Sequence, residues 1–171
     1  MEKAELAQRI KAVAYLEGDF LLRSGRRSKY YLDKYLFETE PVILAELGRR
    51  MAAHAADADQ VAGAELGGVP LAAATSMACG KPFIIVRNAK KDYGTGKMME
   101  GKLLPGARVL LVEDIATTGG QVLEAAKVLQ AAGATVTKIV CTIDRKEGAR
   151  ENIEAAGFAF ESLLTREDLG I

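Results

Sequence analysis

The chain has 171 residues, of which 49% are hydrophobic and 27% are charged. A chain of this length corresponds to about one domain and buries roughly 70% of its unfolded surface, so a single globular domain over 1–171 is expected and disorder is not. Lys and Arg together number 23, and Asp and Glu also number 23. This balance excludes a broad positive field for a nucleic-acid backbone, so any anion has to be bound by a local group of residues.

Cysteine and histidine chemistry is scarce. The two cysteines, Cys79 and Cys141, have no CxxC partner, and His54 is the single histidine. No zinc site, redox pair or Ser/His/Asp triad is therefore expected. The N-terminal residues lack the apolar region of a signal peptide, and no apolar run is long enough to span a membrane. These features predict a cytoplasmic protein with reduced cysteines.

The first forty residues predict a helix and an extended arm. Leu6, Ile10 and Val13 recur at helical spacing within residues 2–16. Residues 19–37 carry apolar and aromatic residues on both sides of Ser24-Gly25, which predicts two strands or an extended arm joined by a turn. A second helix is expected from Pro41, with a buried face formed by Val42, Ile43, Leu47 and Met51.

Strands and helices alternate in the rest of the chain. Short apolar runs predict strands at 60–66, 82–87, 108–115, 135–144 and 158–164, the last at the edge of the sheet. A helix of small residues is expected from Pro70 to Gly80, and another before Gly133 has a buried face of Val122, Ala125, Ala126 and Leu129. This alternation predicts an α/β fold with a mostly parallel sheet flanked by helices.

One connection, residues 88–107, is longer than the usual βα loop. It carries basic residues, Lys90, Lys91, Lys97 and Lys102, against two acidic ones, Asp92 and Glu100. Gly94, Gly96 and Gly101 allow it to change conformation. Two interpretations stay open: a solvated surface loop, or a basic lid that closes over a polyanion.

The most specific motif runs from Val109 to Gln121. An apolar strand ends in Glu113 and Asp114, and a loop rich in Thr and Gly then leads into a helix. Backbone N–H groups at such a helix start form a phosphate cradle, and ligands of open α/β sheets bind at the carboxyl ends of strands. The acids suit a partner that donates hydrogen bonds or carries positive charge, such as sugar hydroxyls or Mg²⁺, so a sugar phosphate is the expected ligand. The alternative is that both acids only cap the helix and solvate the strand end.

Other phosphate motifs fail on spacing. The stretch KDYGTGKM does not have the glycine and Ser/Thr positions of a Walker A loop, and GAELGG lacks the order of a dinucleotide fingerprint.

The run VLLVEDIATTGG resembles the phosphoribosyl diphosphate signature of type I phosphoribosyltransferases. The segments LRSGRRSKYYLD, GAELGGVPLA and DRKEGARENIEAAG are similar to the orotate phosphoribosyltransferase family in particular. The resemblance covers nearly the whole chain. It implies the type I phosphoribosyltransferase fold, with a small N-terminal hood (residues 1–40) and a flexible lid loop (residues 88–107).

The resemblance also implies the site residues. Phosphoribosyl diphosphate would be bound by Arg87, Lys91, Glu113, Asp114, Ile115, Ala116, Thr117, Thr118, Gly119, Gly120 and Gln121, with Lys91 and Asp114 as the catalytic residues. Orotate would contact Thr117, Arg145, Tyr30 and Tyr31. Two alternatives remain: Arg145 forms only a surface ion pair with Glu147, and the tyrosines are ordinary sheet core.

The lid departs from the family pattern Arg-Lys-x-x-Lys-x-His-Gly. Arg87, Lys91 and Gly94 match it, but Asn88 replaces a lysine and Tyr93 replaces a histidine. In the N-terminal segment, Arg23 stands where the family usually has a lysine.

The implied reaction is the transfer of ribose 5-phosphate from 5-phosphoribosyl 1-diphosphate to orotate, which gives orotidine 5′-monophosphate and diphosphate in UMP biosynthesis. The family uses Mg²⁺ held mainly by the substrate, and it forms homodimers in which a lid lysine reaches the partner's site. The alternatives are a phosphoribosyltransferase for another base and a transcriptional regulator of the same fold. A regulator would need a DNA-binding segment or a basic face, and the sequence has neither.

Overall fold

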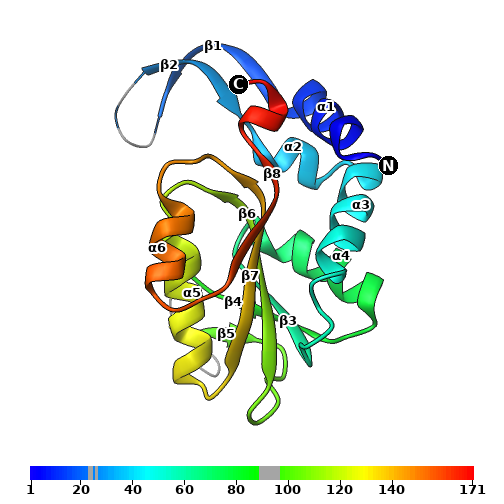
Figure 1. Ribbon diagram of the computed structural model, residues 1–171, viewed down its shortest axis with the longest axis vertical. Helices are drawn as coiled ribbons and strands as arrows, with labels where there is room; N and C mark the ends of the chain where they lie inside the picture. Colours follow the sequence, from blue (N-terminus) through cyan, green and yellow to red (C-terminus); the bar gives the residue numbers. More distant parts are fainter. Residues whose placement is uncertain (23–24, 26, 89–96) are drawn as a thin grey trace.

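A six-stranded sheet lies at the centre of the computed structural model, which describes residues 1–22, 25, 27–88 and 97–171 (Figure 1). The strand order is β5-β4-β3-β6-β7-β8, and every neighbouring pair is parallel except β4 and β5. The strands are β3 (Gln60–Ala64), β4 (Phe83–Val86), β5 (Met99–Glu100), β6 (Arg108–Ala116), β7 (Thr135–Asp144) and β8 (Phe160–Thr165). The predicted α/β class and the edge position of the last strand are confirmed.

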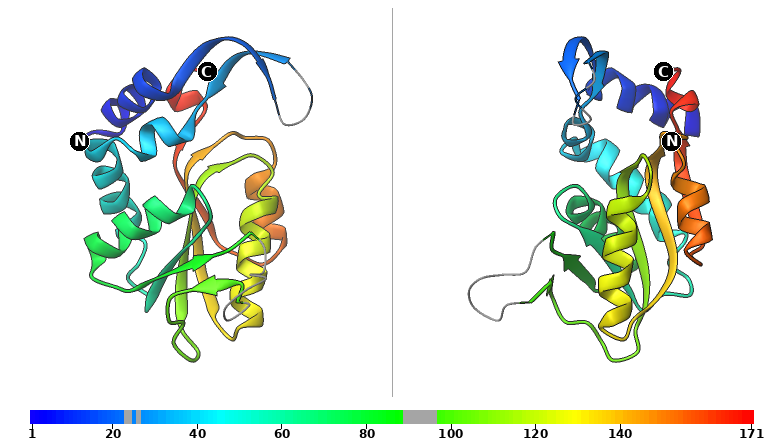
Figure 2. Two further views of the ribbon diagram at one scale, coloured as in Figure 1. Left: turned by 180° about the vertical axis from the view of Figure 1, so that it is seen from behind. Right: turned by 90° about the vertical axis from the view of Figure 1, so that its left-hand side faces the viewer.

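Helices cover both faces of the sheet (Figures 1 and 2). On one face lie α5 (Gly120–Ala131) and α6 (Ala149–Ala155), and on the other lie α3 (Pro41–Ala52) and α4 (Gly68–Cys79). Alternate residues of β6 serve the two layers: Leu110 and Val112 pack in the core of the α3/α4 face, whereas Val109 and Leu111 pack on the α5/α6 face. A strand buried on both faces has to be apolar throughout, which explains the continuous run in the sequence.

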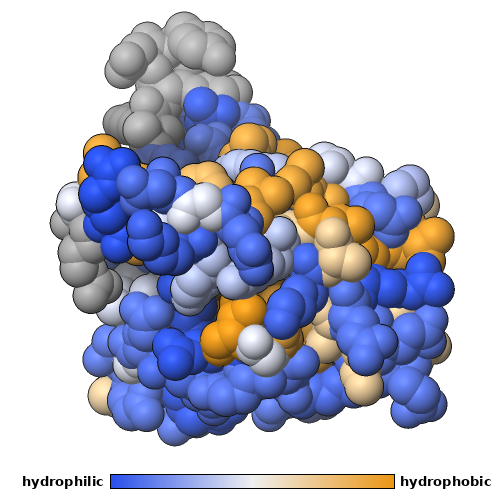
Figure 3. Space-filling view, turned by 90° about the horizontal axis from the view of Figure 1, so that it is seen from above, coloured by the Kyte–Doolittle hydropathy of each residue, from blue (hydrophilic) through white to orange (hydrophobic). Residues whose placement is uncertain are grey.

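The hood sits at the end of the sheet where the parallel strands have their carboxyl ends (Figure 1). It consists of α1 (Lys3–Ala14), the antiparallel hairpin β1 (Tyr15–Leu21) and β2 (Arg27–Leu32), and α2 (Lys34–Glu38). The C-terminal turn η1 (Glu167–Leu169) lies against α1, where Lys11 Nζ donates to the carbonyl of Gly170 at 3.2 Å. Figure 3 looks onto this end of the molecule and shows hydrophobic residues gathered among hydrophilic ones.

Two residues of the predicted buried faces are exposed. Val13 is 37% exposed and Val42 is 51% exposed, whereas Leu6, Ile10, Ile43, Leu47 and Met51 are buried. On α3 the buried residues follow a spacing of four, so Val42, one position before Ile43, is rotated off that face. Pro41 begins α3 as predicted, and the carboxylate of Glu40 accepts the amide of Ile43 at 2.8 Å.

Three elements differ from the prediction. The first helix ends at Ala14, because Tyr15 already belongs to the hairpin. The short helix α2 lies inside the segment interpreted as extended, with the Asp33 carboxylate accepting the amide of Tyr35 at 3.1 Å. In the long connection, β5 pairs with β4; two residues are too few to produce a periodic pattern. The peptide bond between Glu65 and Leu66, after β3, is cis.

No helix in the described part of the chain has the length and apolar character needed to cross a bilayer.

Candidate active site

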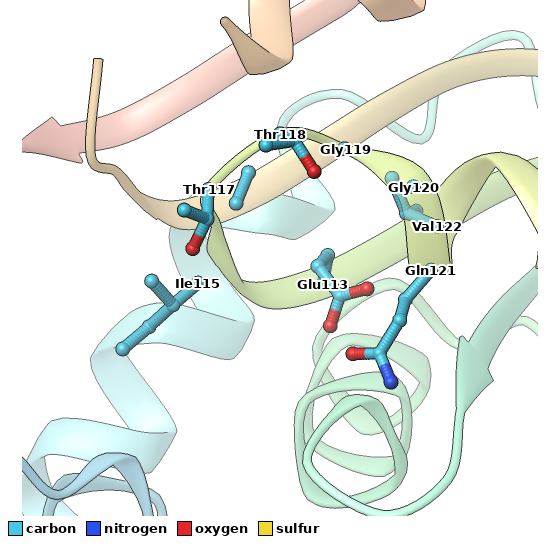
Figure 4. A pocket seen from close by; sticks show the side chains of 9 residues that line it. Glu113, Ile115, Thr117, Thr118, Gly119, Gly120, Gln121 and Val122 are labelled. Atoms are coloured by element: carbon cyan, nitrogen blue, oxygen red, sulfur yellow. The ribbon is translucent and has the colours of Figure 1, made fainter. Parts of the chain in front are cut away.

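The connection from β6 to α5 forms a cradle at the carboxyl end of the central strand (Figure 4). It surrounds a cavity of about 90 Å³ lined by Glu113, Ile115, Ala116, Thr117, Thr118, Gly119, Gly120, Gln121 and Val122. Gly119 has φ +81°, and a Cβ there would lie 3.0 Å from Ile153, so glycine is required at this turn. The first N–H groups of α5 face this cavity with the positive end of the helix dipole.

Hydrogen bonds from α5 and α6 fix the position of the loop. Asn152 Nδ2 donates to the carbonyl of Thr118 at 2.9 Å, and the Leu123 amide donates to the carbonyl of Gly119 at 3.0 Å. Figure 4 shows the side chains of Glu113 and Gln121 on the inner side of the cradle, whereas Ile115 and Thr117 lie toward its other end. The cradle thus offers backbone donors and threonine hydroxyls at one side of a buried carboxyl group.

The two acids have different surroundings, although they are neighbours in the sequence. Glu113 lines the cradle and accepts the amide of Asp114 at 3.0 Å. Burial, with the nearby charge of Asp114, raises the pKa of Glu113. The Asp114 carboxylate, whose side chain is 4% exposed, instead forms an ion pair with Lys34 of α2, with 2.6 Å between Oδ2 and Nζ. One acid therefore faces the cradle and the other faces the hood.

Gly67, before α4, makes room for the Asp114 carboxylate. A Cβ on Gly67 would lie 1.7 Å from Oδ2 of Asp114, a separation too short for two atoms that are not bonded. The sequence places the dipeptide Gly67-Gly68 in the family-like segment GAELGGVPLA without a role for either glycine. Gly67 is needed for the approach of a site carboxylate.

Arg145 and Tyr30 meet in a second cavity, of about 370 Å³, between the hood and the sheet. Its lining residues are Leu22, Arg27, Ser28, Tyr30, Arg145, Glu147 and Arg166. The amide of Arg145 donates to the carbonyl of Ala116 at 3.0 Å, so this cavity adjoins the end of β6 that leads into the cradle. Arg145 Nε donates to Glu147 at 3.1 Å, which is the ion pair considered as the alternative role.

The two tyrosines lie on opposite faces of β2, as adjacent strand residues do. Tyr30 lines the cavity of Arg145 and stacks on Tyr15 at a centroid distance of 5.4 Å. Tyr31 contacts Phe20 at 5.7 Å and is 42% exposed. The structure therefore brings Tyr30, but not Tyr31, to Arg145.

Arg87 lies at the edge of the long connection, beside the cradle. It lines a cavity of about 410 Å³ together with Gln121 and Met98, and its amide donates to the carbonyl of Met98 at 2.8 Å. Its guanidinium is 3.6 Å from Glu65 and 3.8 Å from Glu100. Lys91, with Lys90, Tyr93 and Gly94, lies outside the described residues, as does Arg23.

Three cationic residues near these cavities were missed in the sequence analysis. Lys34 was not considered, because its helix was interpreted as an extended segment. Arg166 follows the end of β8 just as Arg145 follows β7, and its amide donates to the carbonyl of Asp144 at 3.1 Å. The rule that ligands bind at the carboxyl ends of strands would have selected it. Arg27, paired with Asp19 at 2.7 Å, gives no sequence signal that separates it from other surface arginines.

Comparison with known proteins identifies the family. The sequence model of the phosphoribosyl transferase domain matches residues 38–162. An orotate phosphoribosyltransferase of Methanocella arvoryzae is 44% identical over 169 residues, 98% of this chain and 95% of that protein. One of Pyrococcus abyssi is 47% identical over 156 residues, 89% of this chain and 86% of that protein.

Solved structures agree with the sequence comparison. The crystal structure of Mycobacterium tuberculosis orotate phosphoribosyltransferase in complex with Fe(III) dicitrate has a TM-score of 0.89 and 36% identity, with 99% of each chain covered. The same protein in complex with 5-phospho-α-D-ribosyl 1-diphosphate has a TM-score of 0.84 and 35% identity, again with 99% of each chain covered. The chain belongs to the phosphoribosyltransferase family, and within it to the orotate phosphoribosyltransferases.

Proposed function

We propose that the protein transfers the ribose 5-phosphate group of 5-phosphoribosyl 1-diphosphate to orotate, giving orotidine 5′-monophosphate and diphosphate. The observation that carries the proposal is that two cavities of matching chemistry are lined by residues at the carboxyl ends of neighbouring strands, β6 and β7. A helix-start cradle for a phosphate adjoins a cavity with arginines and an aromatic ring for an anionic base, joined by the bond from the Arg145 amide to the Ala116 carbonyl. Membership of the orotate phosphoribosyltransferases supports the same reaction.

The cradle is proposed to bind the 5′-phosphate. The N–H groups from Ala116 to Gln121 and the two threonine hydroxyls supply donors that need no charged side chain. Glu113 and Asp114 are proposed to accept hydrogen bonds from the ribose hydroxyls. A carboxylate there also moderates the positive charge that develops on the ribose ring in the transition state.

The second cavity is proposed to bind orotate. The Arg145 guanidinium suits a carboxylate or a ring oxygen because it presents a planar pair of donors. Tyr30 supplies an aromatic surface beside it, and Thr117 lies at the junction with the cradle. The position of Tyr31 on the other face of β2 supports Tyr30 as the wall of this cavity.

The chemical step is a displacement at the anomeric carbon. Orotate N1 gives up its proton to solvent or to the departing diphosphate, and its electron pair forms the new C–N bond. The bond from the anomeric carbon to the diphosphate oxygen breaks, and that electron pair leaves with the diphosphate. Arg87 and Lys91 are proposed to stabilise this growing negative charge. The role of Lys91 is inferred from the resemblance of residues 87–94 to the lid motif of the family.

Mg²⁺ fits this site as an ion carried by the substrate. Among the described residues, no group of three or more His, Cys, Asp or Glu side chains could hold a metal ion. Asp114 is already paired with Lys34, and one oxygen of Glu113 accepts a backbone amide. Diphosphate oxygens are the hard ligands that Mg²⁺ prefers, so the residues that bind the substrate would hold the ion through it. When bound, Mg²⁺ neutralises charge on the leaving group.

We also propose a homodimer in the cytoplasm, with a lid lysine that reaches the partner's site. An apolar surface on α3 and α4 supports the dimer: Met77 is 86% exposed there, beside a cavity of about 510 Å³ lined by Pro41, Leu44, Ala45, Pro70, Ala73, Ala74, Met77 and Ala78. The cytoplasm is supported by Cys79 and Cys141, which are free thiols.

The function is tested by incubating the protein with 5-phosphoribosyl 1-diphosphate and Mg²⁺ and with orotate, uracil or adenine in separate reactions. Orotate should lose its ultraviolet absorbance, and the other two bases should remain. Reaction of adenine or uracil instead would assign another phosphoribosyltransferase. Salt-sensitive retention of DNA on a filter, without turnover of any base, would assign a regulator.

A further inference from the structure

A buried carboxyl group of the hood, Glu38, has no role in the reaction described above. It ends the helix α2 and is 1% exposed. Neither of its side-chain oxygens has a hydrogen-bond partner among the described residues. A buried carboxylate without a partner is strongly destabilising, so the group is expected to carry a proton or to have a function that offsets the cost.

Glu38 lies beside the ribose-binding carboxylate proposed above. The point where a Cβ of Gly67 would stand is 1.7 Å from Oδ2 of Asp114 and 3.0 Å from Oε1 of Glu38. The two carboxyl groups therefore converge on the same glycine, one from β6 and one from α2. The absence of a side chain on Gly67 permits this convergence.

Lys34 completes the group. It is four residues before Glu38, which places both side chains on one side of α2, and its Nζ is 2.6 Å from Oδ2 of Asp114. Burial by itself lowers the pKa of Lys34, but the hydrogen bond and the charge of Asp114, together with smaller contributions from Tyr35 and Glu113, outweigh burial, and the pKa is raised. One ammonium group thus faces two carboxyl groups, and it balances only one of them at a time.

The charges around Glu38 favour its neutral form. Burial raises its pKa to about 8, with a further contribution from the negative charge of Asp114. Glu113 on β6 and Asp33 at the start of α2 act in the same direction, and Lys34 acts against them. The helices α1 and α3 also pack on α2, but the largest effects on the pKa of Glu38 come from burial, α2, its start and β6.

We propose that protonated Glu38 is a positioning residue for Asp114: while Glu38 is neutral, Lys34 stays with Asp114 and holds its carboxylate for the ribose hydroxyls. Loss of the Glu38 proton places a second anion at Gly67, which repels Asp114 and competes for Lys34. The site then loses affinity for the sugar phosphate while its remaining donors are intact. This inference rests on the proposed function, because it assigns Asp114 to the ribose.

The test is the pH dependence of kcat/KM for 5-phosphoribosyl 1-diphosphate between pH 6.5 and 9.5, measured with orotate in excess. The variant is Glu38→Gln, which keeps the size of the side chain but carries no proton that can be lost. The matched control is Glu151→Gln, an exposed glutamate of α6. The kcat/KM of wild type and of the control should fall about tenfold per pH unit above the titration of Glu38. That of Glu38→Gln should fall less, because Glu113 is then the remaining buried carboxyl group with a raised pKa at the site.

The inference is overturned if the ratio of Glu38→Gln to wild type is constant across this range. If Glu38→Gln does not fold, a second measurement uses Glu113→Gln, which removes the other buried carboxyl group with a raised pKa. Infrared spectroscopy of this variant should show a protonated carboxylic acid at pH 7 that is lost by pH 10, and the lack of that band at pH 7 would also overturn the inference. Absence of orotate turnover in the wild type at every pH would refute the proposed function instead, so the two failures are distinguishable.

Discussion

Gly67→Ala tests whether the approach of Asp114 to the glycine turn matters. The backbone at Gly67 has φ −65° and ψ −30°, which alanine adopts without strain, so a Gly-to-Ala change by itself would stabilise by about 0.4–1 kcal/mol. The new methyl group, however, would stand 1.7 Å from Oδ2 of Asp114 and 3.0 Å from Glu38. The carboxylate has to move by more than an ångström, which disturbs the contact of its Oδ2 with the Lys34 ammonium group.

Overpacking at a buried site lowers the free energy of unfolding by about 1–3 kcal/mol. The small backbone gain from alanine offsets part of this loss. We predict a net loss of about 1–2 kcal/mol, which lowers the Tm by about 3–6 °C for a domain of this size. Loss of kcat/KM for 5-phosphoribosyl 1-diphosphate should exceed tenfold, because Asp114 leaves its position. The measurements are thermal unfolding at pH 7 and initial rates with orotate in excess.

Gly120→Ala is the control for the unfolding measurement. Its new Cβ would have no neighbour nearer than 3.8 Å, so its Tm should not fall. A Gly67→Ala protein with wild-type Tm and wild-type kcat/KM would refute the reasoning, because it would mean that the close approach of Asp114 has no consequence.

Four further predictions follow from the site. Lys91→Ala should lower kcat by roughly 100-fold and leave the Tm unchanged, because a loop cation acts on the leaving group; unchanged turnover would remove it from the mechanism. Arg145→Gln should raise KM for orotate by roughly 10–100-fold, the value of a charge-assisted hydrogen bond, and an unaltered KM would leave only the ion pair with Glu147. Asp114→Asn should lower kcat/KM for 5-phosphoribosyl 1-diphosphate at least about tenfold, and normal kinetics would make the acid structural. Hydrogen bonds from Arg49 lower the pKa of Glu46 to about 2. The contribution of Glu46 to the free energy of unfolding, below about 1 kcal/mol, is therefore complete above pH 4.5 and is lost as the pH falls toward 2. Glu46→Gln should unfold more easily than wild type at pH 7 but not at pH 2, and equal stability of the two proteins at both pH values would contradict this.

The sequence predicted the parts of the fold that depend on local pattern. Strands buried on both faces give continuous apolar runs, and the glycine-rich loop after Asp114 has a composition that few other structures require. The loop between β6 and α5 was therefore predicted correctly, and its binding of a phosphate stays a prediction.

The features of the site that the sequence did not predict depend on contacts between segments far apart in the chain. Lys34 and Asp114 are far apart in the chain, and the helix that carries Lys34 is too short to show a period. The separation of Tyr30 from Tyr31 follows from strand alternation, but only once β2 is known to be a regular strand. That Glu113 lines the cradle whereas Asp114 faces the hood follows from the alternation of side chains at the end of β6 and from the ion pair of Asp114 with Lys34 of α2.

The most direct test of the whole account is the stoichiometry of the orotate reaction. Diphosphate and orotidine 5′-monophosphate are quantified together, with and without Mg²⁺, after mixing the wild-type protein with orotate and 5-phosphoribosyl 1-diphosphate. One diphosphate and one nucleotide should form for each orotate consumed, and turnover should nearly stop once Mg²⁺ is chelated. Diphosphate release without a nucleotide product, or a product from uracil or adenine in place of orotate, would contradict it.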